Sequence, residues 1–264
     1  MSMHESPILT TLEAGVAHIR FNRPQAMNAL DVPMAEALLA SVTALRANPQ
    51  ARVIVLSGEG KVFMAGGDLQ TFFADLPNAP ATARALIDPL HEALALLAEG
   101  DAPVIASLHG AVAGAGLSIA LGADLAIAAE DTRFTLAYSR IGANVDGGGS
   151  WALPRTVGLK RAMEIALLSD MMSAANALEL GLVNQVVPPA EREAATLVLA
   201  QRLAQGPTGA YGRIKRLLRG SLQTPLREQM AAERDAFVEG ASTADFAEGL
   251  AAFFGKRPAN FSGR

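Results

Sequence analysis

The sequence contains no cysteine, and this absence excludes several kinds of chemistry at once. Without a thiol the chain can form no disulfide bond, carries no thiolate nucleophile and offers no thiolate ligand to zinc or to an iron–sulfur cluster. Histidine is also scarce, and the four histidines, at positions 4, 18, 91 and 109, have no spacing typical of a metal site. We therefore expect neither a redox-active thiol nor a bound metal.

The sequence also has no excess of basic residues. The 264 residues include 22 Lys and Arg against 26 Asp and Glu, which gives a net charge of −4 with both signs interspersed. Such a chain has no basic face for a nucleic acid or for an anionic membrane surface. Residues 1–15 lack both the basic region and the apolar region of a secretory signal, so we expect a cytoplasmic location.

Charge is absent from one long segment. Residues 102–123 contain no Asp, Glu, Lys or Arg over 22 positions, a length sufficient to span a bilayer. Eleven of these residues are Ala or Gly, Pro103 lies near the start and His109 in the middle. This composition predicts a buried strand, a tight turn and a buried helix, and it marks a place where the backbone approaches something closely.

Apolar runs and helical spacings alternate along the chain, which predicts an α/β fold with parallel strands. Residues 7–21 indicate a hairpin about Glu13, Ala14 and Gly15. Further strands are expected at 53–58, 104–110, 124–130 and 183–187, and helices at 33–45, 81–98 and 116–122. From about 192 to 254 the pattern is helical, with interruptions near 206–207, 220 and 240–241. This helical tail suggests packing or oligomerisation.

Two turns rich in Gly and Ala each follow a buried strand: GKVFMAGGDL (60–69) and HGAVAGAGLS (109–118). Neither fits a nucleotide-binding motif, because Ile119 takes the place of the third glycine of GxGxxG and Val62 that of the Ser or Thr of a phosphate loop. Small residues at such turns expose main-chain N–H groups to a ligand, and two of them can form an oxyanion hole. The alternative is that these glycines only permit tight packing.

The motifs NRPQAMNAL (22–30), SGEGKVFMAGGDL (57–69), HGAVAGAGLSIALGADLAIAAEDTRF (109–134), IGANVDGGGSWALPRTVG (141–158) and ALELGLVNQVV (177–187) occur in order. They resemble the enoyl-CoA hydratase/isomerase family, also called the crotonase family, over nearly the whole chain. The resemblance implies a crotonase-like spiral of repeated ββα units in residues 1–205, with the acyl-CoA site. It implies a helical trimerisation region in residues 206–264.

The family resemblance assigns roles to several positions. The oxyanion-hole donors are the N–H groups of Gly67 and Ala115, which would stabilise an enolate of an acyl-CoA thioester. Ser118 and Tyr138 occupy the positions of the two glutamates of a hydratase, and neither is a carboxylate. Asp146 matches the single acid of the family's isomerases, in a pocket with Ser118, Tyr138 and Gly147. We also expect the apolar residues just before Asp146 to keep water away.

Within the family, the sequence is most similar to the phenylacetate-degradation isomerases, which act on an epoxide or oxepin CoA thioester and on 3-enoyl-CoAs. A second resemblance points to the 4-chlorobenzoyl-CoA dehalogenases. His91 matches the general base of that branch and Asp146 matches its nucleophile, although Tyr138 replaces its tryptophan. The alternative for His91 is a partly solvated position on a helix surface beside Glu92.

The resemblance also indicates contacts for coenzyme A, which enters as part of the substrate, so no separate cofactor is expected. The residues concerned are Arg23, Ala65, Gly66, Asp68, Leu69 and Lys256. Asp68 is interpreted as a helix cap, and Arg23 and Lys256 are alternatively ordinary solvated residues. The family's trimers or dimers of trimers imply a homo-oligomer. A hydratase, a dehalogenase or a noncatalytic acyl-CoA-binding protein remain alternatives to an isomerase.

Overall fold

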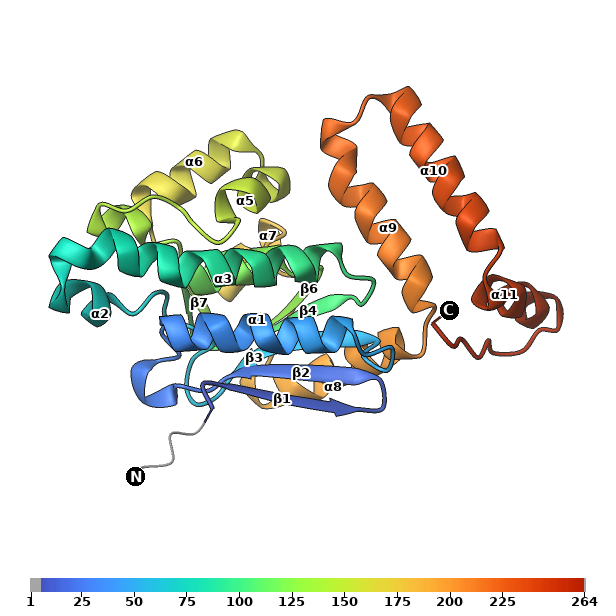
Figure 1. Ribbon diagram of the computed structural model, residues 1–264, viewed down its shortest axis with the longest axis horizontal. Helices are drawn as coiled ribbons and strands as arrows, with labels where there is room; N and C mark the ends of the chain where they lie inside the picture. Colours follow the sequence, from blue (N-terminus) through green and yellow to red (C-terminus); the bar gives the residue numbers. More distant parts are fainter. Residues whose placement is uncertain (1–5, 264) are drawn as a thin grey trace.

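The structure is a computed structural model, described here for residues 6–263. Its main sheet has six strands in the order β1-β2-β3-β4-β6-β9 (Figure 1). They are β1 (Ile8–Glu13), β2 (Val16–Phe21), β3 (Val53–Gly58), β4 (Val104–Leu108), β6 (Leu125–Ala129) and β9 (Gln185–Val187). Strands β1 and β2 form the predicted antiparallel hairpin, and the other neighbours are parallel, as the alternation of strands and helices predicts.

A second, smaller sheet lies beside the first and was not predicted. It joins β5 (Ala111–Ala113), β7 (Arg133–Thr135) and β8 (Met172–Ser173), of two or three residues each. Strand β5 runs parallel to β7, and β8 is antiparallel to β7. Part of the 109–118 stretch that we interpreted as a turn is therefore the strand β5. Strands this short carry no periodic pattern, because alternation needs at least four residues to be visible.

Helices cover both faces of the main sheet. Figure 1 places α1 (Val32–Arg46) and α3 (Ala79–Glu99) over one face and α8 (Arg192–Ala204) against the other. The two faces follow from the period of two in a strand. In β3, Val53 and Val55 pack with Ala200 of α8, whereas Ile54 and Leu56 join the larger core on the opposite face.

The remaining helices are short segments around the sheets and a longer C-terminal set. The first group comprises α2 (Leu69–Ala74), α4 (Ala115–Gly122), α5 (Gly149–Val157), α6 (Leu159–Leu168) and α7 (Ala174–Glu179). The second comprises α9 (Thr208–Gly220), α10 (Leu226–Ala241) and α11 (Ala244–Phe254). Single 3-10 turns occur at Pro24–Ala26, Leu76–Asn78, Tyr138–Ile141, Pro189–Glu191 and Ser221–Gln223.

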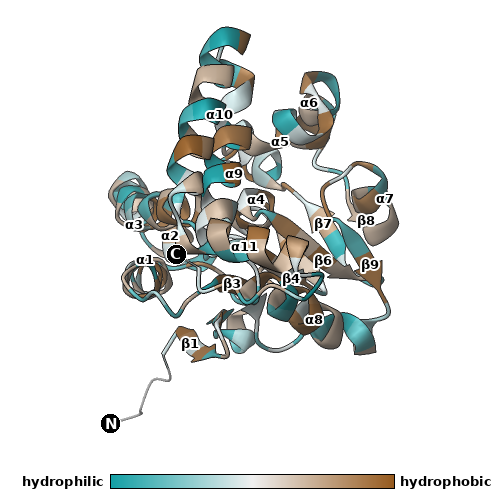
Figure 2. Ribbon diagram, turned by 90° about the vertical axis from the view of Figure 1, so that its right-hand side faces the viewer, coloured by the Kyte–Doolittle hydropathy of each residue, from teal (hydrophilic) through white to brown (hydrophobic). Residues whose placement is uncertain are grey.

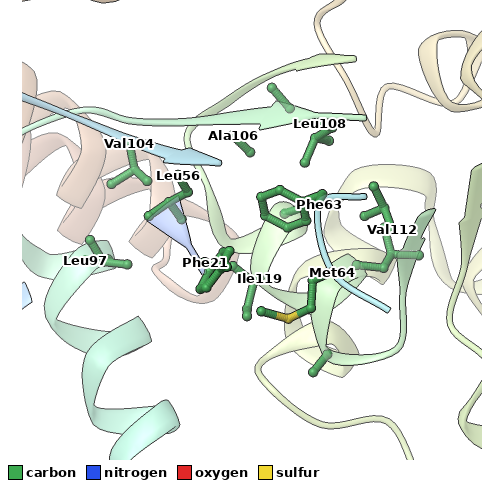
Figure 3. Close-up of a cluster of buried hydrophobic side chains, with 14 of the residues drawn as sticks. Phe21, Leu56, Phe63, Met64, Leu97, Val104, Ala106, Leu108, Val112 and Ile119 are labelled. Atoms are coloured by element: carbon green, nitrogen blue, oxygen red, sulfur yellow. The ribbon is translucent and has the colours of Figure 1, made fainter. Parts of the chain in front are cut away.

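The larger core lies where β3, β4 and α4 meet. Figure 3 shows side chains from these elements and from neighbouring segments converging there, among them Phe21 of β2 and Phe63 and Met64 of the loop after β3, which are fully buried. The rings of Phe21 and Phe63 meet edge to face with centroids 5.4 Å apart, a favoured aromatic geometry. Residues 63 and 64 directly precede the AGGD turn, so this packing anchors the turn to the sheet.

The C-terminal helices extend away from the layered body (Figure 1). They break at residues 205–207, 221–225 and 242–243, close to the predicted interruptions. The chain end nevertheless returns to the sheet, because Nη1 of Arg52 donates to the Phe261 carbonyl at 2.9 Å. The carboxylate of Asp245 accepts from the backbone N–H groups of Ser262 and Gly263.

The uncharged segment 102–123 forms the predicted buried strand, β4, and the predicted buried helix, α4, with the unpredicted strand β5 between them. Over residues 6–263, no helix combines the length and the apolar character that crossing a membrane requires.

Candidate active site

The two turns rich in Gly and Ala come into direct contact. A bridge joins Met64 to Val112, and the Ala113 N–H donates to the Met64 carbonyl at 2.9 Å. One step further on, a Cβ placed on Gly114 would lie 3.4 Å from Cα of Gly66. Gly66 has φ of 109° and Gly114 has φ of 51° with ψ of −122°, conformations that favour glycine. The close approach therefore depends on both glycines.

This contact sets the two expected oxyanion-hole donors side by side, because Gly67 and Ala115 each follow one of the touching glycines. The loop before Gly67 is fixed on both sides: the Leu30 N–H donates to the Gly66 carbonyl, and the Asp68 N–H donates to the Leu30 carbonyl. Within the described residues no backbone carbonyl accepts from the Gly67 N–H. Ala115 is the first residue of α4, whose initial N–H groups have no partner inside the helix.

Asp146 lies at the end of an irregular segment that connects the 3-10 turn at Tyr138–Ile141 to α5. Glycines bring this segment against α4, since a Cβ on Gly147 would lie 3.1 Å from Cβ of Ser118. Ser118 is one turn from Ala115 on α4, so Gly147 contacts this helix about one helical turn, roughly 5 Å along the axis, from its N-terminal end. The Gly147 N–H donates to Oδ1 of Asp146 at 2.5 Å.

His91 contacts this carboxylate directly. Nε2 of His91, on α3, lies 2.6 Å from Oδ1 of Asp146, a distance at which an imidazole N–H donates to a carboxylate. The His91 side chain is 50 % exposed and that of Asp146 is 20 % exposed, so the pair lies at the mouth of a pocket. His91 is thus partly solvated on the surface of α3, as the alternative predicts, and it also contacts the Asp146 carboxylate.

Ser118 and Tyr138 lie close to the Asp146–Gly147 segment, but only Gly147 of the three expected pocket residues lines the cavity described below. Ser118 is fully buried on α4, and its Oγ lies 3.4 Å from the Tyr138 hydroxyl. Burial raises the pKa of Tyr138 to about 12, so the phenol stays protonated and acts as a neutral hydrogen-bonding group. Neither side chain serves as the carboxylate of a hydratase pair.

The segment before Asp146 is more solvated than we expected. Ile141 is 55 % exposed and Ala143 is exposed, whereas Val145 is half-buried. The prediction that these three residues keep water from Asp146 is therefore wrong for the first two within this chain. Two left-handed residues, Ala137 and Gly142, flank the 3-10 turn that carries Ile141.

A cavity of about 830 Å³ runs from the His91–Asp146 pair between α3, α4, α5 and α9. Its wall is largely apolar and includes Leu94, Leu97, Val104, Ile119 and Ala152. Gly67 and Ala115 do not line it, but Ala115 begins the helix whose later residues do. The cavity therefore extends from the His91–Asp146 pair toward the C-terminal helices.

Sequence reasoning missed two groups of residues that shape this site. Asn28 is fully buried with φ of 53°, and its Nδ2 donates to the carbonyls of Glu59 and Val62, which holds the 22–30 segment against the 57–64 loop. A buried Asn in the left-handed region has no sequence signal beyond that residue type. Arg216 and Arg219 of α9 line the far end of the cavity, and only the packing of α9 on the body brings them there.

The expected coenzyme A contacts divide into two places. The guanidinium of Arg23 forms ion pairs with Asp31 at 3.2 Å and with Asp68 at 3.0 Å and is only 21 % exposed. Asp68 also caps α2 by accepting from the Gln70 N–H, as expected. Arg23 therefore orders the loop that carries Ala65, Gly66 and Leu69, where Leu69 is exposed.

Lys256 lies elsewhere. It lies two residues beyond the end of α11, and Figure 1 places α11 and α2 at opposite ends of the long axis of the molecule. One copy of the chain thus does not bring Lys256 to the 65–69 loop, and only a second copy could supply this lysine there.

The chain matches known proteins along its whole length. The family model for enoyl-CoA hydratase/isomerase matches residues 11–264. A protein from Rhodobacter capsulatus named "probable enoyl-CoA hydratase" is 39 % identical over all of both chains. The 1,2-epoxyphenylacetyl-CoA isomerase of Escherichia coli is 36 % identical, with 97 % of this chain and 98 % of that protein covered.

Solved structures agree with this match. The crystal structure of an enoyl-CoA hydratase from Polaromonas sp. JS666 superposes with a TM-score of 0.92 at 35 % identity, covering 96 % of this chain and 99 % of the other. The family match over residues 11–264 and this superposition show that the chain has the crotonase fold and belongs to the enoyl-CoA hydratase/isomerase family.

Proposed function

We propose that the protein is an acyl-CoA isomerase that shifts a double bond, with Asp146 as its single base. One observation carries the proposal: Asp146 is the carboxylate at the reacting end of the cavity, and the two positions beside it hold Ser118 and Tyr138. The other carboxylate in the cavity lining is that of Glu99, which lies eight residues beyond His91 on α3, roughly 12 Å along the helix axis. A single acid suits proton transfer between two carbons of one substrate.

The reaction needs no water and no cofactor besides the coenzyme A of the substrate. In a 3-enoyl-CoA, Asp146 removes a proton from C2, and the electron pair of that C–H bond delocalises into the thioester to give a dienolate. The N–H groups of Gly67 and Ala115 donate to the oxyanion, each contributing about 3 kcal/mol of barrier reduction. The protonated Asp146 then returns the proton to C4, which leaves the double bond between C2 and C3. A ring epoxide or oxepin thioester offers the same enolate chemistry.

The test combines a substrate panel with an Asp146→Asn variant. We expect the wild-type protein to convert 3-enoyl-CoA to the conjugated 2-enoyl-CoA, followed by its ultraviolet absorbance, and the variant to lose at least about 100-fold in kcat, because it lacks the base. Asp88→Asn, on the exposed surface of α3, is the matched control and should keep full activity. Retention of activity in Asp146→Asn would contradict the mechanism.

A second candidate function is hydrolytic dehalogenation of an aryl-CoA, and the 2.6 Å contact between His91 and Asp146 favours it. Asp146 would attack the halogen-bearing ring carbon, expel halide and form an aryl ester, which water activated by His91 would hydrolyse. Tyr138 in place of tryptophan weighs against it. Incubation with 4-chlorobenzoyl-CoA separates the two candidates, since only a dehalogenase releases chloride and accumulates an aryl ester in a His91→Gln variant.

The hydratase function that the Rhodobacter relative is named for is less well supported by the site. Hydration needs a group that activates water and a second acid that protonates the α-carbon, and the neutral Ser118 and Tyr138 supply neither. We therefore expect hydration of crotonyl-CoA to be much slower than isomerisation. The chain would act as a homotrimer or dimer of trimers, in which a neighbouring Lys256 reaches the coenzyme A loop.

A further inference from the structure

The cavity carries charged groups at the end farthest from Asp146, and the isomerisation does not use them. At that end Arg216 and Arg219 of α9 line the wall together with Glu99 of α3. Between the two ends the lining is apolar, with side chains such as Leu94, Leu97 and Ile119. The acyl group of a substrate would therefore pass through an apolar slot and end beside two guanidinium groups.

Positive charge is in excess around this end. The three charged side chains that line this end are joined through ion pairs to four others outside the lining, which gives seven in all: Arg46, Glu99, Asp101, Asp124, Lys215, Arg216 and Arg219. Four of them are cations and three are anions, which leaves one positive charge uncompensated. The reason is that Lys215 and Arg219 share a single partner, because each lies 2.8 Å from a different oxygen of Asp124.

Arg216 and Arg219 also have N–H groups that make no hydrogen bond within the described residues. Nη2 of Arg219 donates to Asp124 and to the Gly122 carbonyl, and Arg216 uses Nη1 for Asp101. In the part of the chain that the structure describes, Nε and Nη1 of Arg219 make no hydrogen bond, although this side chain is only 25 % exposed. A guanidinium presents paired N–H groups that match the two oxygens of a carboxylate, so this end suits a carboxylate better than a methyl group.

Helix α4 gives the length of the slot. The oxyanion donor Ala115 begins this helix, and Gly122, whose carbonyl accepts from Arg219, ends it. Seven residues of helix span roughly 11 Å, which an extended acyl chain of about eight to ten carbons bridges from its thioester to its far end.

We infer that this protein takes acyl-CoA thioesters whose acyl chain ends in a carboxylate, with Arg219 as the residue that recognises it. The inference rests on the proposed function for the placement of the thioester at Gly67 and Ala115. It names the substrate class, an ω-carboxyacyl-CoA of about eight to ten carbons. The apolar lining accepts the methylene chain, and the uncompensated positive charge attracts the terminal carboxylate.

Binding of unreactive saturated thioesters tests the inference without catalysis. Calorimetric titration with octanedioyl-CoA and octanoyl-CoA compares two ligands that differ only at the far end. We expect octanedioyl-CoA to bind about 10- to 100-fold more tightly, the range for hydrogen bonds to a charged group. Arg219→Gln should remove that preference and leave octanoyl-CoA binding unchanged. Arg213→Gln, on the same helix but outside the cavity lining, should retain it.

Equal or weaker binding of octanedioyl-CoA by the wild-type protein would overturn the inference. So would an Arg219→Gln variant that weakens both ligands equally, because Arg219 would then only fasten α9 to the end of α4. If Arg219→Gln does not fold, Arg216→Gln provides the same comparison, with a reduced preference expected and an undiminished one contradicting the inference.

The two proposals fail separately. A preference for octanedioyl-CoA that persists in Asp146→Asn supports the carboxylate site whatever reaction the protein catalyses. Isomerisation of a methyl-terminated 3-enoyl-CoA without any preference between the two saturated ligands supports the proposed function and rejects the carboxylate site.

Discussion

At the scale of single residues, the candidate site combines two neutral hydroxyl groups with one carboxylate and one imidazole, held close together. Asp146 has a backbone N–H and an imidazole on the same oxygen, Oδ1, and within the described residues Oδ2 accepts no side-chain or backbone hydrogen bond. Tyr138 and Ser118 supply hydroxyl groups where a hydratase would have carboxylates. The chemistry open to the site is therefore set by one ionisable carboxyl group and its histidine partner.

Tyr138 gives a prediction about stability at alkaline pH. Its pKa is about 12 in the folded protein against 10.0 for the ordinary phenol, because burial disfavours the phenolate. A raised folded-state pKa stabilises the fold fully below pH 10, and this contribution is lost as the pH rises from 10 toward 12. The loss reaches about 2 kcal/mol near pH 12.

Urea unfolding of the wild-type protein and Tyr138→Phe between pH 9 and 11.5 measures this contribution. We expect the stability difference between the two proteins to shift in favour of the variant above pH 10, since phenylalanine cannot ionise. A difference that stays constant over this range would show that the Tyr138 phenol is not desolvated in the folded state.

At the scale of elements, the proposed oxyanion hole consists of main-chain N–H groups on two loops in contact, not of any side chain. The contact between Gly66 and Gly114 lies between strand β5 and helix α4 on one side and the AGGD loop on the other. Both glycines have backbone conformations that disfavour a Cβ. The geometry of the donors is thus a property of two elements that meet at their ends.

Gly114→Ala tests this dependence. The change places a Cβ in a conformation nearly restricted to glycine, at a cost of about 1–3 kcal/mol, and pushes α4 away from Gly66. We expect lower kcat with smaller change in KM, together with a lower denaturation midpoint. Gly220→Ala at the end of α9 has negative φ and no close contact, so it should affect neither. A fully active Gly114→Ala enzyme would contradict the placement of the oxyanion hole.

At the scale of the whole molecule, the C-terminal helices leave large apolar side chains uncovered. Figure 2 shows hydrophobic segments along α9 and α10, which project from the body. The exposed side chains on α9 to α11 and the turns between them include Leu218, Leu222, Leu226, Met230, Phe237, Val238, Phe253 and Phe254. Apolar surface on this scale marks an interface, which agrees with the proposed assembly into trimers. The division of the chain at residues 205 and 206 stays a prediction.

Light scattering on the purified protein tests the assembly. We expect three or six chain masses, and a shift toward smaller species for Phe254→Asp, because a carboxylate would be buried at an apolar contact. Val198→Asp, at a similarly exposed position on α8, should leave the mass unchanged. A monomer at all concentrations would contradict the proposed trimer and the role of Lys256.

The local pattern of the sequence already determines most of the fold. Buried parallel strands are continuous apolar runs, so β3 was predicted with its observed bounds and β4, β6 and β9 nearly so, whereas β5, β7 and β8 are too short to show a pattern. The local sequence predicts only part of the candidate site. Glycines around residues 66, 114 and 147 mark where backbone segments approach one another closely, and Asp146 is the carboxylate beside the last of them.

Only the tertiary structure decided which distant groups meet. The contact of His91 with Asp146 joins residues 55 positions apart, and Arg219 reaches the cavity because α9 folds back onto the end of α4. The ion pairs of Arg23 with Asp31 and Asp68 likewise could not be predicted from the sequence. Hydrophobic periodicity is a local property that the chain itself carries, whereas the pairing of charges depends on how whole elements pack.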